Sequence, residues 1–145
     1  MRFELMYESF FKILKGVPLT LEVVFISTLL GFGLAIIVAL MRISDNKLYS
    51  VPAYSFIYLI RGTPLLLQLY FVYYGISQFS FVRESFLWPI LKEPFWFGII
   101  TLTISTGAYS AEIIRGGIQS VSQGYIESGK ALGLGRVSLF FRIVM

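Results

Sequence analysis

Residues 107–144 read GAYSAEIIRGGIQSVSQGYIESGKALGLGRVSLFFRIV, and this stretch decides how the rest of the chain is interpreted. It begins apolar and then becomes polar and rich in glycine, which predicts a short helix and turn outside a membrane. Such a segment is poorly suited to cross lipid and well suited to lie against another protein. We therefore expect the residues before it to hold it at a membrane surface.

The composition is that of an integral membrane protein. The 145 residues are 57% hydrophobic and 14% charged, whereas a soluble domain is about half apolar and a quarter charged. Three stretches of about 18 or more residues carry no charge, which is long enough for a helix to cross the hydrocarbon core. We predict an all-α membrane helical bundle with spans at residues 17–41, 63–82 and 94–114, followed by a cytoplasmic loop at 116–145.

The residue types exclude several classes of function. The chain has no cysteine and no histidine, so it has no disulfide and no metal site built from these residues. No carboxylate pair lies inside an expected span, and we therefore expect neither an enzyme nor a cofactor nor a bound metal. The basic residues are scattered along the chain, so nucleic acid is not an expected partner.

The first span carries small residues at helical spacing. Ser27, Gly31, Ala35 and Ala39 would share one face, which lets another helix approach closely. The alternative is that small residues are simply common in membrane helices. Before this span, residues 1–15 mix charges with apolar side chains at helical spacing and predict a short interfacial helix.

The sequence RGTP at residues 61–64 interrupts the next apolar stretch. Pro64 disfavours helical geometry at the residue before it and removes one hydrogen bond if a helix continues. We predict an amphipathic segment at 48–60 near the cytoplasmic face, with the second span after it. Arg61 then anchors at the interface, lines a protein cavity or lies beside a carboxylate. We expect Gln68 to donate or accept a hydrogen bond inside the bundle.

The third span is rich in hydroxyl groups. These groups either bond the backbone of their own helix or a neighbouring helix, or they line a path for a polar solute. Glu112 and Arg115 are three residues apart and able to pair. The candidates for a solute path, or for intramembrane polar contacts, are Arg61, Gln68, Thr106, Tyr109 and Glu112.

The sequence GYIESGKA at residues 124–131 almost matches a phosphate-binding loop. Ala131 stands where the motif needs a hydroxyl to bind Mg²⁺, and no buried strand precedes Gly124. We therefore exclude nucleotide binding by this loop.

The same region carries a more specific pattern. ESGKALG at residues 127–133, followed by Ile143, resembles the E-A-A-x-x-x-G-x₉-I-x-L-P signature of the membrane subunits of ABC importers. Glu127, Gly133 and Ile143 occupy matching positions. Further upstream, RGTPLL, Gln68, GAYSAEIIRG and VSQG are similar to the permeases for polar amino acids.

The resemblance implies a multi-pass permease subunit in the inner or plasma membrane of a bacterium, in an ATP-driven importer for polar amino acids. The implied partners are cytoplasmic ATPase subunits, a second permease subunit (a copy or a homologue), an extracytoplasmic amino-acid-binding protein and membrane lipid. The resemblance also places Glu127, Ser128, Gly129 and Gly133 at the positions that couple to the ATPase. On this view, Gly133→Trp is expected to uncouple ATPase docking without unfolding the spans.

Two features depart from the family pattern. Ser128 and Gly129 replace the usual Ala-Ala, and a glycine inside a helix costs about 1 kcal/mol. The sequence stops at Met145, where the family continues with proline and two more spans. Residues 1–145 are therefore interpreted as a partial ABC transporter transmembrane domain, from a fragment or a truncated product. The alternative function is a non-transporting membrane anchor or assembly partner.

Overall fold

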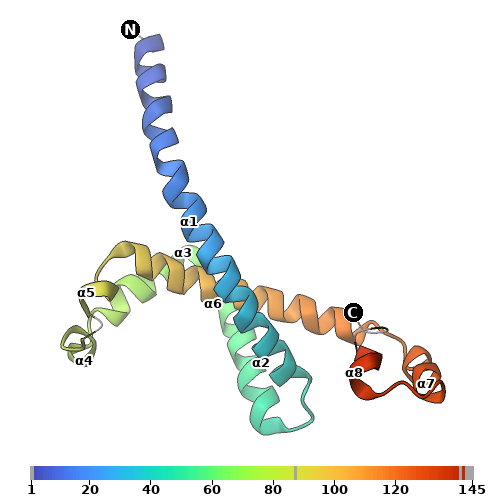
Figure 1. The fold of residues 1–145 in the computed structure, drawn as a ribbon. Coiled ribbons are helices and arrows are strands. Elements are labelled where there is room, and N and C mark those ends of the chain that lie inside the picture. The colour runs from blue at the N-terminus through green and yellow to red at the C-terminus, as the bar shows by residue number, and fades with distance from the viewer. Residues whose placement is uncertain (1, 87, 141, 143–145) are drawn as a thin grey trace.

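The computed structural model describes residues 2–86, 88–140 and 142, and none of these residues lies in a strand. The helices are α1 (Arg2–Ile43), α2 (Lys47–Arg61), α3 (Leu65–Tyr70), the π-helix η1 (Phe71–Gly75), α4 (Ser80–Arg83), α5 (Trp88–Leu91), α6 (Pro94–Gln119), α7 (Gln123–Ala131) and α8 (Arg136–Leu139) (Figure 1). Two helices are long and apolar enough to cross a membrane, or three if the bent pair α2 and α3–η1 counts as one span. The predicted all-α membrane bundle is confirmed.

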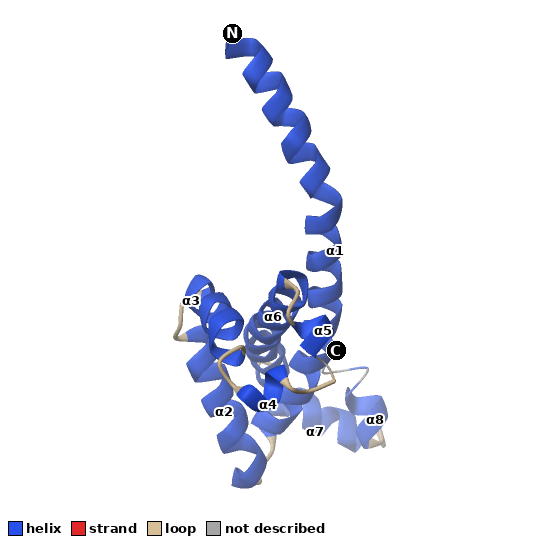
Figure 2. Cartoon of the chain, turned by 90° about the vertical axis from the view of Figure 1, so that its left-hand side faces the viewer, coloured by secondary structure: helices blue, strands red, loops and turns tan. Residues whose placement is uncertain are grey.

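Helix α1 is continuous over 42 residues, so the helix expected in residues 1–15 and the span expected at 17–41 belong to one element. Pro18 lies inside the helix and removes only one hydrogen bond, and no turn signal accompanies it. The Thr20 hydroxyl also donates to the carbonyl oxygen of Gly16 at 3.0 Å. At 1.5 Å per residue the helix is about 63 Å long, roughly twice the hydrocarbon thickness. Its N-terminal part accordingly projects beyond all other elements (Figure 2).

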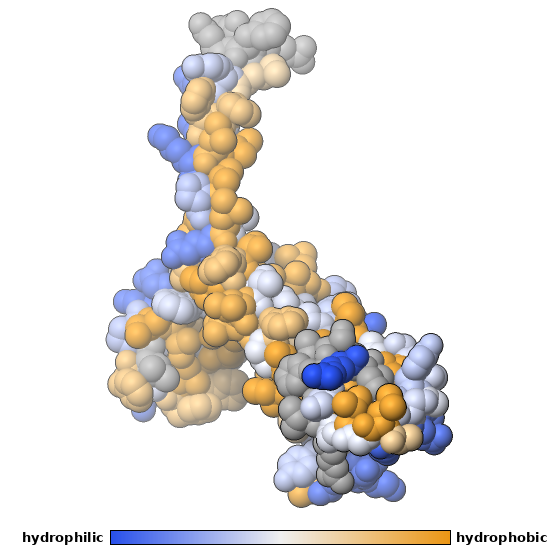
Figure 3. All heavy atoms as spheres, turned by 45° about the vertical axis from the view of Figure 1, so that its right-hand side comes forward, coloured by the Kyte–Doolittle hydropathy of each residue, from blue (hydrophilic) through white to orange (hydrophobic). Residues whose placement is uncertain are grey.

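The projecting part of α1 is amphipathic, as predicted for residues 1–15. Figure 3 shows an apolar stripe along it beside a hydrophilic one. Exposed apolar side chains at helical spacing include Met6, Phe10, Ile13 and Val17, and the exposed charges at helical spacing are Glu8, Lys12 and Lys15. This division suits a boundary between water and lipid, although the segment is the beginning of α1 rather than a separate helix.

The core of the fold is a close crossing of α1 and α6. A Cβ added to Gly31 would lie 2.8 Å from the Thr106 Cβ, and one added to Gly107 would lie 2.7 Å from the Leu34 Cδ2. Ser27, Ala35 and Ala39 are buried on the same face of α1. The small-residue face predicted from the sequence is therefore confirmed as a packing surface. Its small side chains let the two backbones approach.

Helix α2 returns alongside α1. Asn46 caps it, with its Oδ1 accepting from the Leu48 amide at 2.9 Å. Ala53 and Ile57 of α2 then pack against Ala35 and Ala39 of α1. The predicted helix at 48–60 is present, and it packs against α1. Its 15 residues rise by about 21 Å, which carries Arg61 away from the turn between α1 and α2.

The remaining boundaries differ from the prediction in two places. After a bend of 105° between α2 and α3–η1, η1 ends at Gly75, before the predicted end at Val82. The Ser77 hydroxyl donates to the Tyr73 carbonyl at 2.6 Å where the chain turns. Helix α6 begins at Pro94 as predicted but continues to Gln119, past the predicted end at 114 and into the expected loop. Side-chain contacts between its last turns stabilise this extension.

Candidate coupling segment and polar cleft

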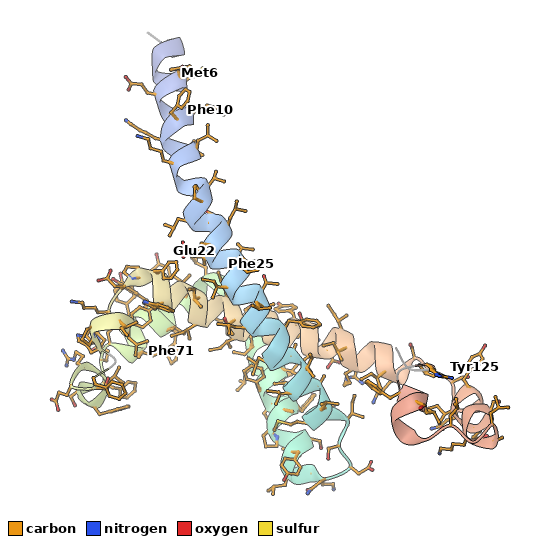
Figure 4. The ribbon with its side chains drawn as sticks, viewed as in Figure 1. Met6, Phe10, Glu22, Phe25, Phe71 and Tyr125 are labelled. Carbon is orange, nitrogen blue, oxygen red and sulfur yellow. The ribbon has the colours of Figure 1, made fainter. Side chains whose placement is uncertain are left out.

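The predicted helix and turn after the last span is present as α7, which follows α6 at the end of the fold far from the N-terminus (Figure 1). Glu127 and Ser128 are exposed on α7, whereas Gly129 is buried. The side chain of Tyr125, labelled in Figure 4, is also exposed. The four residues at the expected coupling positions therefore lie in one short segment but face different environments. The predicted match at Ile143 lies outside the described residues.

Gly133 ends α7 through its backbone conformation. Its φ of +76° lies in the left-handed region, which glycine adopts without a steric penalty. The Gly133 amide donates to the Lys130 carbonyl at 2.9 Å, and the Leu134 amide donates to the Gly129 carbonyl at 3.1 Å. These two bonds form a Schellman motif. A Cβ added to Gly133 would meet nothing within 4 Å, so close helix contact within this chain is not the reason for this glycine.

Because of this backbone conformation, a substitution at Gly133 perturbs the end of α7 as well as any contact with a docked partner. Gly133→Trp strains the backbone whatever it does to docking. We expect even Gly133→Ala to destabilise the end of α7 by about 1–2 kcal/mol. Amide hydrogen exchange at residues 128–134 measures this effect and should become faster. Gly135→Ala is the matched control, because Gly135 has no positive φ and also has open space around it. Equal exchange in the two variants would contradict the conformational role.

A cleft of about 360 Å³, lined by charged and aromatic residues, opens between α1, α2 and α6. Its lining residues are Arg42, Tyr54, Ile57, Tyr58, Arg61, Gly62, Tyr109 and Glu112. Three of the five residues singled out from the sequence for a solute path thus come together here: Arg61, Tyr109 and Glu112. Arg61 lines this cleft and is exposed in the described part of the chain. Its guanidinium lies 5.3 Å from the centre of the Tyr109 ring, a cation–π contact worth about 0.5–2 kcal/mol.

Glu112 forms the predicted ion pair with Arg115. The Arg115 Nε donates to the Glu112 Oε1 at 3.0 Å, and both side chains are about one quarter exposed. The other side of the Arg115 guanidinium bonds Gln119. The carboxylate that lines the cleft is therefore already engaged by an arginine that does not line it.

Gln68 lies at the bend between α2 and α3. Its Nε2 donates to the carbonyl oxygens of Ile60 and Thr63, at 2.6 Å and 3.0 Å, and contacts the Thr63 hydroxyl oxygen at 2.8 Å. Pro64 has no N–H, so the Ile60 carbonyl would otherwise lack the donor that a continuous helix supplies. Gln68 thus acts as a donor, one of the two roles expected from the sequence, and its acceptors belong to the bend itself.

Thr106 does not line the cleft. It lies at the crossing of α1 and α6, where its side chain faces Gly31. Another hydroxyl of α6, that of Thr101, donates to the Phe97 carbonyl at 2.8 Å. For these two residues the structure favours packing and backbone bonding over a path for solute.

The candidates named from the sequence did not include three residues that line the cleft: Arg42, Tyr54 and Tyr58. The Arg42 guanidinium lies 4.9 Å from the centre of the Tyr54 ring, and Tyr54 stacks with Tyr58. The spacing of Tyr54, Tyr58 and Arg61 places them on one helix face, a signal that the sequence did contain. The position of Arg42 against this face depends on how α2 turns back on α1. No group of three acidic side chains close enough to hold a metal ion occurs among the described residues.

Comparisons with known proteins agree with this architecture. A family model described as a binding-protein-dependent transport system inner membrane component matches residues 31–145. The octopine transport system permease protein OccM of Rhizobium radiobacter is 48% identical over 97% of this chain and 57% of its own length. The nopaline transport system permease protein NocM of Agrobacterium fabrum is 49% identical, over 99% of this chain and 60% of its own.

More distant relatives and a solved structure extend this agreement. The histidine/lysine/arginine/ornithine permease protein HisM of Escherichia coli is 34% identical over 90% of this chain and 55% of its own length. A crystal structure of an amino acid ABC transporter with histidines matches 94% of this chain and 63% of that chain, with a TM-score of 0.72 and 34% identity. The chain thus spans less than two thirds of the relatives it matches. It belongs to the family of binding-protein-dependent transport system inner membrane components.

Proposed function

We propose that this chain is part of a permease subunit in an ATP-driven importer, located in a bacterial inner or plasma membrane and crossing it several times. The proposed solutes are polar amino acids, or the octopine and nopaline named in two relatives. The observation that carries the proposal is identity of nearly one half with two such permeases along almost the whole chain. The apolar helices and the close crossing of α1 and α6 support it.

The proposed partners follow from the same family. A second permease subunit completes the path, an extracytoplasmic binding protein delivers the solute, and cytoplasmic ATPase subunits hydrolyse ATP. The permease then has no catalytic site of its own. The solute path is proposed to include the cleft that contains Arg61, Tyr109 and Glu112.

The ATPase is proposed to dock on α7. Its side chains Tyr125 and Glu127, and Leu132 directly after it, are exposed, and Leu132 keeps 81% of its surface accessible. Only residues 120–122 separate α6 from α7, so a displacement of α7 reaches α6 through a very short connection. Through the crossing at Gly31 and Gly107, α6 then moves against α1.

Uptake measurements test the proposed function. A strain that lacks this protein should lose ATP-dependent uptake of at least one of octopine, nopaline, L-arginine and L-histidine, and the restored gene should return it. If the restored strain takes up none of the four better than the deletion strain, the proposed importer function is wrong for these solutes.

A substitution at Leu132 tests the proposed docking of the ATPase. Leu132→Glu places a charge on an exposed apolar position of the proposed interface, and we expect about a tenfold loss of uptake and of ATPase co-purification. Leu132→Met is the matched control and should retain both, because it keeps an apolar side chain of similar size. Membrane levels of the three proteins are compared by immunoblot. Normal ATPase co-purification with Leu132→Glu would exclude Leu132 from the interface.

A further inference from the structure

The cleft between α1, α2 and α6 carries more positive charge than its carboxylate balances. Arg42 and Arg61 line it together with Glu112. The Glu112 carboxylate is bonded by Arg115, at 3.0 Å from its Nε. Among the residues that the structure describes, neither Arg42 nor Arg61 has a carboxylate within ion-pair distance. Two guanidinium groups therefore face this cleft without a direct anionic partner in the described part of the chain.

The two guanidinium groups are held by aromatic rings rather than by acceptors. Arg42 lies over Tyr54 and Arg61 over Tyr109, at 4.9 Å and 5.3 Å from the ring centres. A ring fixes the plane of a guanidinium while leaving its edge N–H groups free to donate. The Nε of Arg42 is buried and has no hydrogen-bond partner. A buried donor without an acceptor is unusual in a folded protein and calls for an explanation.

The position of the cleft makes an anion more favourable there. Helix α2 begins at Lys47 and packs against the apolar part of α1 before it ends at Arg61. An arginine among apolar helices normally faces a cavity and pairs with an opposite charge. Its planar fork of donors matches a carboxylate. The volume of about 360 Å³ lies in the range of small-molecule sites.

We propose that this cleft binds the carboxylate of the transported solute, with Arg61 as the principal donor and Arg42 as the second. This inference rests on the proposed function, since it takes the anion to be part of the imported molecule. Tyr54, Tyr58 and Tyr109 form the apolar walls and hold the guanidinium planes. Glu112 keeps Arg115 at the margin of the cleft, so that it does not compete for the carboxylate.

The test is solute binding to the intact importer, purified through a tag on this chain and placed in lipid nanodiscs without the binding protein. The probes are the panel member with the greatest uptake (octopine, nopaline, L-arginine or L-histidine) and its analogue in which every carboxylate is replaced by a carboxamide. We expect the wild type to bind the acid at least tenfold more tightly than the amide. Arg61→Gln should remove this preference by weakening binding of the acid alone, and Arg61→Lys should restore part of it.

Arg83→Gln is the matched control, because Arg83 lies in α4 and does not line the cleft. It should bind both probes as the wild type does. A purely structural role of Arg61 would weaken acid and amide equally, and that result would overturn the proposal. Equal affinity of the wild type for the two probes, or no binding of the acid, would also overturn it. Each of these results leaves uptake by the wild type intact and so spares the proposed function, which fails only if uptake itself is absent.

Discussion

Gly31→Leu should separate α1 from α6, whereas Gly33→Leu should leave their packing unchanged. A Cβ at residue 31 would lie 2.8 Å from the Cβ of Thr106 and 3.1 Å from the carbonyl oxygen of Thr103. The carbonyl belongs to the α6 backbone, so the clash is relieved only if the whole helix shifts. Overpacking a core ordinarily costs about 1–3 kcal/mol, and leucine adds three further carbon atoms to this contact. We therefore expect a loss at or above the upper end of that range.

Thermal unfolding in detergent and hydrogen exchange along α6 measure this effect. Gly33 is two residues away on the same helix and has open space around it, so the control introduces the same side chain with the same change in helix propensity. Gly107→Leu should reproduce the effect of Gly31→Leu from the α6 side, because its Cβ would meet Leu34. Equal stability of the two α1 variants would mean that α1 and α6 do not cross at Gly31.

Gln68→Met should loosen the bend between α2 and α3. Methionine has a similar length but no donor, so the carbonyl oxygens of Ile60 and Thr63 lose the amide that now bonds them. The bond to the Ile60 carbonyl is part-buried, and a buried acceptor left without a partner costs about 1–3 kcal/mol. The Thr63 hydroxyl bonds the Leu59 carbonyl at 3.0 Å and the Ile60 carbonyl at 3.3 Å, so it replaces Gln68 only in part. We expect faster amide exchange at the residues next to the bend and slower uptake.

Gln78→Met is the control for this substitution. Gln78 is exposed and lies in the turn after η1, so the same chemical change there removes no bond to the bend. Gln68→Asn separates length from chemistry, since it retains the amide on a shorter side chain and should rescue little. If the backbone amides of residues 59–64 exchanged at the wild-type rate in the Gln68→Met variant, Gln68 would not be the group that holds the bend.

Local interactions explain which parts of the candidate site were predictable. The pair Glu112 and Arg115 is separated by three residues on one helix, so its geometry follows from helical spacing alone. The interruption at Pro64 follows from the missing N–H of proline. The cleft joins Arg42, Arg61 and Tyr109 from three different helices, and no local pattern contains their relative positions.

The sequence by itself determined the membrane class, the small face of α1, the break at Pro64 and the family of the chain. Each of these depends on composition, helical spacing or a short motif, which are properties of neighbouring residues. Only the tertiary structure decided that α1 is continuous, that α2 returns along α1, and that the bend reaches 105°. It also decided that Gly133 is required for its positive φ, and that the cleft gathers guanidinium groups from separate helices. These features depend on which helix faces pack together, and packing is fixed by contacts between residues far apart in the chain.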